Sequence, residues 1–271
     1  MDSILKKIKK QRPIIHCITN QVTINDCANA ILAIGGSPIM AYDEQEVEDI
    51  VSMSQALVIN IGTLNHHCIQ SMIKAGQMAN RLHIPVVLDP VGVGASSLRK
   101  KVLFDMLEQV HFDVIKGNVS EIKVIFNHRG FHGGVDVSQH DQINNDNLDQ
   151  CIHMAQQLSQ KLKGIIVITG VIDIVCQEKK VYIIKNGCSM MARITGTGCM
   201  LGAVIGTFVG CDFSIKSVAY ASAMMGYCGE LAHQKAKSQL SGTGSMRMYL
   251  IDYLSLLDDE QMKRGIHIEK R

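Results

Sequence analysis

Short aliphatic runs without polar alternation recur along this chain, and they restrict its fold more than any other feature. Gly, Pro or Asp residues bound them, and the first six span residues 13–19, 37–41, 56–62, 85–89, 114–118 and 164–170. A strand without alternation is typically buried on both faces. Segments with helical spacing, such as 25–34, 66–82 and 147–163, separate these runs. We therefore predict a three-layer α/β/α fold with a mostly parallel central sheet.

The pattern changes after Gly164. Three runs, at 165–169, 172–177 and 181–185, follow each other too closely for crossover helices, so they predict a short antiparallel edge on the same sheet. The chain then has helical spacing from Cys199 to Leu257. Residues 128–146 are polar and rich in Gly and Asn, which indicates a surface loop or lid. No repeat or linker divides the chain, and we expect one domain over residues 1–271.

Charge and cysteine content exclude several classes of function. The 27 Lys and Arg residues nearly balance the 25 Asp and Glu residues, and the net charge of +2 gives no electrostatic support to a nucleic-acid or membrane-surface role. Nine cysteines form an odd set without a CxxC pair, which is typical of reduced thiols. With neither a signal peptide pattern nor a long apolar span, we expect a cytoplasmic protein.

A glycine-rich turn before a helix is the sharpest local feature. Thr195-Gly196-Thr197-Gly198-Cys199 precedes an apolar helical stretch. Two glycines free the backbone to turn its N–H groups inward, and a helix N-terminus adds its dipole, so the turn suits an anion such as a transferred phosphate. Taken alone, the same pattern also describes a simple tight turn.

Two other strand ends carry charged groups. Asp89 directly follows a buried run, where a carboxylate holds Mg²⁺ directly or through water, or else caps a turn. Lys116-Gly117-Asn118-Val119-Ser120-Glu121 combines a cation, a flexible turn and a carboxylate. A capped helix start explains Asn118 and Glu121 but not Lys116. Ligands of open α/β sheets bind at this carboxyl edge.

In their order and spacing, these motifs resemble the hydroxyethylthiazole kinases, a family of the ribokinase-like superfamily that acts in thiamine salvage. The resemblance runs over nearly the whole chain, from Ile18-Thr19-Asn20 through Leu88–Gly92 to Thr195–Cys199. It implies a ribokinase-like fold and an ATP-dependent transfer of phosphate to the primary alcohol of 4-methyl-5-(2-hydroxyethyl)thiazole. It also implies Mg²⁺ and a homotrimer with active sites between subunits.

The resemblance assigns roles residue by residue. Asn20, Met40 and Gly196 would contact the thiazole, and Lys116 and Thr169 would contact ATP phosphates. Asp89 and Glu121 would organise Mg²⁺. Gly196, Thr197 and Gly198 would form the anion hole, and Cys199 would stand where most ribokinase-like enzymes have a catalytic Asp. Many relatives have Arg at the position of Lys116, and Lys lacks its bidentate fork.

Several alternatives remain open at this stage. A helix N-terminus can depress the pKa of the Cys199 thiol and make it a nucleophile, although the sequence places no base beside it. A weak base or a group that orients the substrate is the interpretation we favour. The nucleotide-dependent NAD(P)H-hydrate dehydratases share the fold but need an Asp where Cys199 stands. A binding regulator without turnover would not need Asp89, Glu121 and Lys116 together.

Overall fold

A computed structural model describes residues 4–128, 143 and 146–271. The loop or lid predicted over 128–146 lies almost entirely outside these residues. Among the described residues, nine strands form one sheet in the order β2-β1-β3-β4-β5-β6-β7-β8-β9. Every pairing from β2 through β6 is parallel, and β7, β8 and β9 add an antiparallel edge. The predicted mostly parallel sheet with its antiparallel edge is confirmed.

The strands are β1 (Ile14–Ile18), β2 (Ser37–Ile39), β3 (Ala56–Asn60), β4 (Val86–Asp89), β5 (Val114–Asn118), β6 (Ile165–Thr169), β7 (Asp173–Gln177), β8 (Lys180–Ile184) and β9 (Ile268–Lys270). The helices are α1 (Ile4–Gln11), α2 (Ile24–Ile34), α3 (Val47–Met53), α4 (His66–Arg81), α5 (Ser97–Gln109), α6 (Val119–His128), α7 (Leu148–Leu162), α8 (Thr197–Cys211), α9 (Ile215–Ser238), α10 (Thr243–Leu256) and α11 (Asp259–Gly265), with 3-10 turns η1 (Val93–Ala95) and η2 (Ser189–Arg193).

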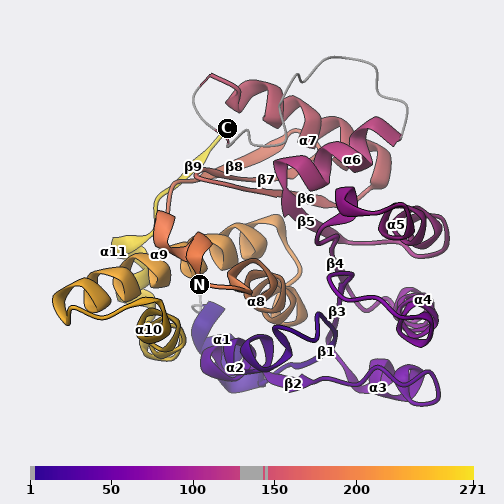
Figure 1. Cartoon of the computed structure of the whole chain (residues 1–271), viewed down its shortest axis with the longest axis horizontal. Helices are drawn as coiled ribbons and strands as arrows, with labels where there is room; N and C mark the ends of the chain where they lie inside the picture. The colour runs from indigo at the N-terminus through magenta and orange to yellow at the C-terminus, as the bar shows by residue number, and fades with distance from the viewer. Residues whose placement is uncertain (1–3, 129–142, 144–145) are drawn as a thin grey trace.

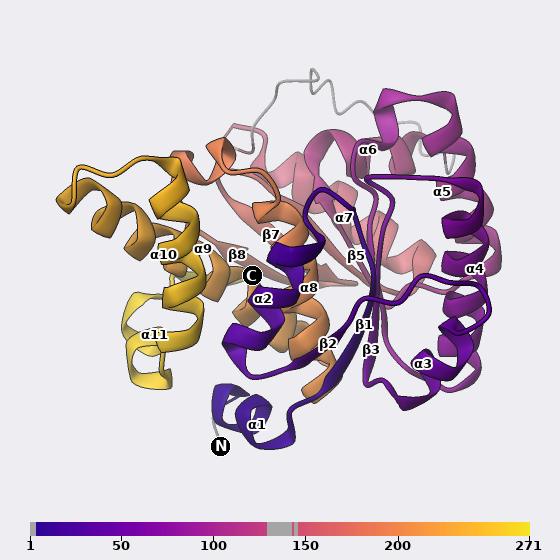
Figure 2. The ribbon, with the colours of Figure 1, turned by 60° about the horizontal axis from the view of Figure 1, so that its bottom comes forward.

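Helices cover both faces of the sheet, as Figures 1 and 2 show. Strand side chains alternate between two apolar clusters. Ala56 and Val58 of β3 join the cluster formed with α1, α2 and α8 to α11, whereas Leu57 and Ile59 join the cluster formed with α3 to α7. Both faces of the sheet are therefore buried against apolar helices, which explains why the strands lack polar alternation.

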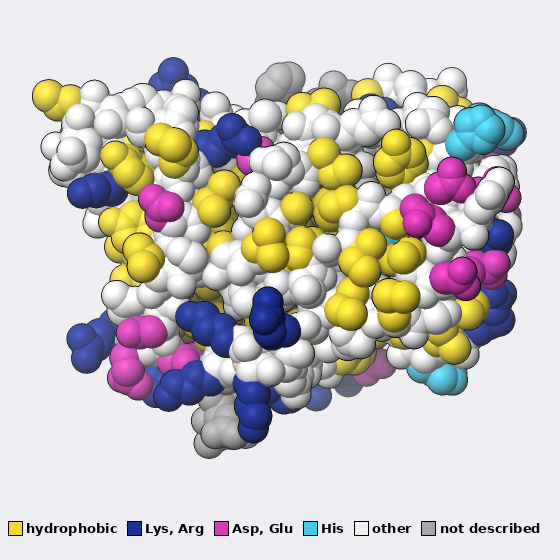
Figure 3. All heavy atoms as spheres, turned by 90° about the horizontal axis from the view of Figure 1, so that it is seen from below, with side chains coloured by type: hydrophobic (Ala, Val, Ile, Leu, Met, Phe, Trp, Pro, Cys, Tyr) yellow, Lys and Arg dark blue, Asp and Glu magenta, His cyan; other side chains and the backbone are white. Residues whose placement is uncertain are grey.

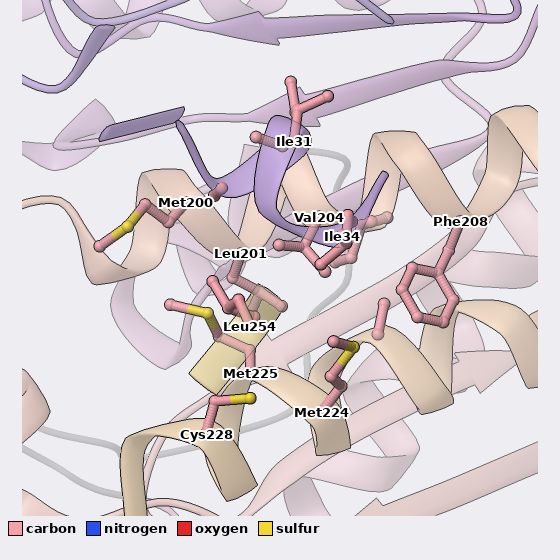
Figure 4. Close-up of a cluster of buried hydrophobic side chains, with 14 of the residues drawn as sticks. Ile31, Ile34, Met200, Leu201, Val204, Phe208, Met224, Met225, Cys228 and Leu254 are labelled. Carbon is pink, nitrogen blue, oxygen red and sulfur yellow. The ribbon is translucent and has the colours of Figure 1, made fainter. Parts of the chain in front are cut away.

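Helix α8 is apolar on all sides because it lies at the centre of one layer, against β1, β3, β4 and α2. Figure 4 shows its side chains meeting those of α2, α9 and α10. Three glycines at four-residue spacing, Gly202, Gly206 and Gly210, face the sheet. A Cβ on Gly206 would lie 2.4 Å from Val58 Cγ2, so only glycine allows this approach. The close packing brings the N-terminus of α8 to the ends of the strands.

The carboxyl edge of the sheet contains a topological switch. The chain passes from β1 outward to β2 and then returns to β3 on the other side of β1. Loops after β1 and β3 therefore run in opposite directions, and sheets of this type bind ligands beyond the strand ends at such a point. Asn20 follows β1 there, and Asn60, Asp89 and Thr169 end β3, β4 and β6.

Candidate active site

A buried ion pair joins two neighbouring strands. Lys116 Nζ of β5 lies 3.0 Å from Asp89 Oδ1 of β4 and donates a second hydrogen bond, of 3.1 Å, to the Gly198 carbonyl of α8. Asp89 is fully buried and Lys116 is 3% exposed. The ammonium group therefore ties the sheet to the glycine-rich turn.

Burial has opposite effects on the two partners. It raises the pKa of Asp89 to about 6, against the opposing attraction of Lys116. Burial would lower the pKa of Lys116, but the negative charges of Asp89 and Glu121 outweigh it, so the pKa is raised. At neutral pH the site holds a carboxylate and an ammonium in a nearly dry environment.

Asn60 bridges Asp89 and Cys199, and the sequence analysis did not single it out. Its Nδ2 donates to Asp89 Oδ2 at 3.0 Å and to Cys199 Sγ at 3.2 Å. Its Oδ1 accepts from the Gly62 N–H at 2.8 Å. Because a backbone N–H can only donate, this bond fixes which way the amide faces. An Asn before a Gly-containing turn looks like a turn residue in sequence, and no local signal distinguishes it.

The glycine-rich turn begins α8. Gly196 has φ +88° and is the N-cap, and a Cβ there would lie 2.5 Å from Thr23 Cγ2. Thr197 Oγ1 donates to the Met191 carbonyl at 3.2 Å, which fixes the turn from η2. The first N–H groups of a helix have no intrahelical acceptor, so the turn and α8 together suit an anion.

Cys199 lies in the first turn of α8 and is 8% exposed. Burial raises its pKa, and the negative charge of Asp89 raises it further, whereas hydrogen bonds with Thr23 and Asn60 oppose this only in part. The depressed pKa that a helix N-terminus can produce is therefore not found. At neutral pH the thiol stays protonated, which disfavours the covalent nucleophile.

Glu121 connects two loops of the site. Its Oε1 accepts from the Gly92 N–H at 2.9 Å, and its Oε2 accepts from the Asn118 N–H at 2.8 Å. Asn118 Oδ1 accepts from the Glu121 N–H in return, so the predicted capped start of α6 is present. Glu121, Asn118 and Gly92 also line a cavity of about 470 Å³. Thr169 pairs with Asn118 in the β5–β6 register, next to this cavity's edge.

Asn20 and Met40 follow the ends of β1 and β2 at the same carboxyl edge of the sheet. Asn20 Oδ1 accepts from the Val22 N–H at 2.9 Å and closes the turn into α2. A Cβ on Gly62 would meet Asn20 Nδ2, so Asn20 packs on the loop that Asn60 supports. Met40 follows β2, is half-buried and packs against the cluster that contains Cys199. The predicted residues thus surround one edge of the sheet.

A second residue missed in the sequence is Arg99 of α5. Its guanidinium donates to the Gly62 carbonyl at 2.6 Å and also to the Val91 carbonyl, so it joins the loops after β3 and β4. An Arg near the start of a helix resembles a solvated residue in sequence, and only the fold reveals this role.

A family model for the hydroxyethylthiazole kinase family matches residues 5–260. The chain belongs to the hydroxyethylthiazole kinase family. A hydroxyethylthiazole kinase of Clostridium acetobutylicum is 47% identical over 267 residues, which cover 98% of this chain and 97% of that protein. The structure of a hydroxyethylthiazole kinase protein from Pyrococcus horikoshii OT3 has a TM-score of 0.89 at 32% identity, covering 99% of this chain and 97% of its own.

Membership of the hydroxyethylthiazole kinase family confirms the resemblance and makes the chain a kinase. The ADP/ATP-dependent NAD(P)H-hydrate dehydratase of Bacillus subtilis superposes with a TM-score of 0.57 at 13% identity, over 95% of this chain and 91% of its own. That likeness shows the ribokinase-like fold alone. Within the described residues, no helix is long and apolar enough to cross a membrane.

Proposed function

We propose that this chain transfers the γ-phosphoryl group of ATP to the primary alcohol of 4-methyl-5-(2-hydroxyethyl)thiazole, as the names of its relatives indicate. One observation carries the proposal. The Asp89–Lys116 pair lies directly under the N-terminus of α8, and Lys116 donates to Gly198 within that turn. A phosphoryl group in transfer would meet fixed N–H dipoles with a cation behind them.

Each residue then has a separate task. Gly196, Thr197 and Gly198 bind the transferred phosphoryl group, and Cys199 orients the alcohol beside it. Phosphoryl transfer passes through a loose transition state in which the alcohol keeps its proton until late, so a protonated thiol is compatible with this role. Asn20, Met40 and Gly196 hold the thiazole.

The burial of Lys116 limits how it can reach ATP. Its Nζ is engaged by Asp89 and Gly198 and almost inaccessible to solvent. We propose that it supports ATP phosphates through its charge, from beneath the glycine-rich turn, and that Thr169, at the partly exposed end of β6 beside Asn118, contacts these phosphates. The bidentate hydrogen bonds of an Arg guanidinium matter less for a buried cation that acts through its charge alone.

The carboxylates of Asp89 and Glu121 fit a hard cation. Within the part of the chain that the structure describes, each carboxylate oxygen accepts one hydrogen bond, which leaves it a second acceptor position. Mg²⁺ typically takes one or two carboxylates and completes its shell with water and phosphate oxygens. When bound, such an ion would neutralise charge on the β- and γ-phosphates. We propose Glu121, which lines the cavity, as the nearer ligand and Asp89 as a ligand through water.

The assembly that we propose is a homotrimer with active sites between subunits, located in the cytoplasm. Figure 3 shows apolar side chains gathered over the face that α10, α2, β2 and α3 present. Large exposed apolar residues of these elements and their adjoining loops include Val22, Leu32, Tyr42, Met53 and Met248. Apolar patches of this kind mark contact surfaces. Light scattering should give about three times the chain mass of 29.8 kDa, and a monomer mass would contradict this assembly.

ADP release tests the activity most simply. The purified chain with ATP and Mg²⁺ should release ADP when the hydroxyethylthiazole is added. A hydroxymethylpyrimidine and pyridoxal serve as matched alcohol controls, and each should give less than about a tenth of that rate, because a pocket is selective for the shape it fits. Equal rates with all three alcohols, or none with the thiazole, would contradict the proposal.

A further inference from the structure

His16 is a buried imidazole to which the mechanism above gives no role. It lies in β1 and has no exposed surface. Its Nε2 lies 2.8 Å from the Ala41 carbonyl oxygen, while its buried Nδ1 has no hydrogen-bond partner among the described residues. A carbonyl only accepts, so Nε2 carries the hydrogen and donates it. Burial lowers the pKa of His16, which keeps the ring neutral.

An apolar side chain at position 16 would avoid the energetic cost of a buried, unpaired nitrogen. The neighbours of His16 in β1 include Ile14, Ile15 and Ile18. A buried acceptor without a partner costs about 1–3 kcal/mol, whereas an aliphatic residue would leave nothing unpaired. Polar groups kept at such a cost tend to mark positions with a function. The hydrogen bond to Ala41 is the feature of His16 that an aliphatic residue would lack.

That bond holds the segment that carries Met40. The parallel register of β1 and β2 ends at the pair His16 and Ile39, so Met40 and Ala41 lie just beyond the ladder. Ile15 and Cys17 of β1 face the cluster against which Met40 packs, and His16, between them, faces the opposite side. The His16 side chain therefore binds the Ala41 carbonyl from one face of the sheet, while the Met40 side chain lies on the other face.

We propose that His16 is a positioning residue, whose hydrogen bond to the Ala41 carbonyl fixes Met40 in the thiazole site. This inference rests on the proposed function, in which Met40 contacts the thiazole. Loss of the bond frees the backbone next to Met40 and weakens thiazole binding, while ATP, which the proposed function assigns to Lys116 and Thr169, is bound as before.

Three substitutions separate the bond from the bulk of the ring. His16→Gln places an amide nitrogen close to the position of Nε2, whereas His16→Asn places one near Nδ1, out of reach of Ala41. His16→Leu has no donor. We expect the KM for the thiazole to rise about tenfold in the Asn and Leu variants and to stay within about twofold in the Gln variant, with the KM for ATP unchanged in all three. KM does not depend on the folded fraction, so partial unfolding does not imitate this result.

Two further variants complete the test. His153→Leu, at an exposed position of α7, is the matched control and should leave both KM values unchanged. In a Met40→Ala background, His16→Leu should add less than about twofold, because the contact that it positions is already lost. A Gln variant as impaired as the Leu variant, or an equal rise in the KM for ATP, would overturn the inference. Wild-type protein without thiazole-dependent ADP release would overturn the proposed function itself.

Discussion

Lys116 Nζ and Asp89 Oδ1, 3.0 Å apart and shielded from solvent, form the ion pair on which the α8 turn rests. Removing one partner of a buried pair leaves an uncompensated charge. We therefore expect Lys116→Met to lower the free energy of unfolding by about 3–5 kcal/mol. Chemical denaturation at pH 7 measures this. Lys101→Met, at an exposed position of α5, is the control and should change stability by less than about 0.5 kcal/mol. Equal effects of the two substitutions would contradict the burial of the Lys116 charge.

Asp89 and Cys199 should differ in their importance for turnover. Asp89→Asn removes the charge that opposes Lys116 and the proposed link to Mg²⁺, and kcat should fall about 10²- to 10⁴-fold. Cys199→Ala removes a protonated thiol that orients the substrate, and kcat should fall by about tenfold or less. Steady-state assays of the two variants at saturating ATP give the comparison. The reverse ranking would show that the thiol, rather than the carboxylate, carries the chemistry.

The acid side of the pH profile should report Asp89. Burial raises its pKa to about 6, so acidification below that pH neutralises the carboxylate. We expect kcat/KM to fall below about pH 6 in the wild type, and the residual activity of Asp89→Asn to lack that limb.

The raised pKa of Asp89 also affects stability, because the folded state binds this proton more tightly than the unfolded state. Relative to Asp89→Asn, the free energy of unfolding of the wild type should therefore rise as the pH falls from about 6 to 4. A relative fall would contradict a raised pKa of Asp89.

Gly196 should tolerate no side chain. Its φ of +88° is strained for other residues, and a Cβ would lie 2.5 Å from Thr23 Cγ2. We expect Gly196→Ala to lower kcat/KM at least about tenfold, because it moves the N–H groups of the turn. Adding Thr23→Ser removes the clashing methyl group and should restore only part of the activity, since the backbone strain remains. Gly244→Ala in α10, where a Cβ meets nothing within 4 Å, should leave activity unchanged.

The elements with strong local signals were predictable from the sequence. The strands from β1 to β8 lie where the apolar runs of the sequence place them, and β1, β3, β4, β5 and β6 are almost entirely buried. Gly35 ends α2 in the left-handed conformation that glycine adopts readily at such a position. In contrast, β9 is a three-residue edge strand, Ile-Glu-Lys, with no apolar pattern of its own, and only its pairing with β8 defines it.

The candidate site was predictable as a set of residues but not as a set of contacts. Strand ends place Asp89 and Thr169 on one edge, because parallel strands share their carboxyl ends, whereas Lys116 lies two residues before the end of β5. The sequence cannot show that Lys116 turns inward to Asp89 and Gly198, or that Asn60 joins Asp89 to Cys199. The bonds to Gly198 and Cys199 depend on how closely α8 approaches the sheet, and that distance is set by Gly202, Gly206 and Gly210 further along the helix.

The identity of the phosphorylated product tests the central claim most directly. Phosphorus NMR and mass spectrometry of a reaction with ATP, Mg²⁺ and 4-methyl-5-(2-hydroxyethyl)thiazole should show one new phosphomonoester on the side-chain alcohol, formed in equal amount to ADP. The same reaction with Asp89→Asn should produce it at least about 10²-fold more slowly. ADP formed with inorganic phosphate in place of the ester, or an undiminished rate in the variant, would contradict this account of the site.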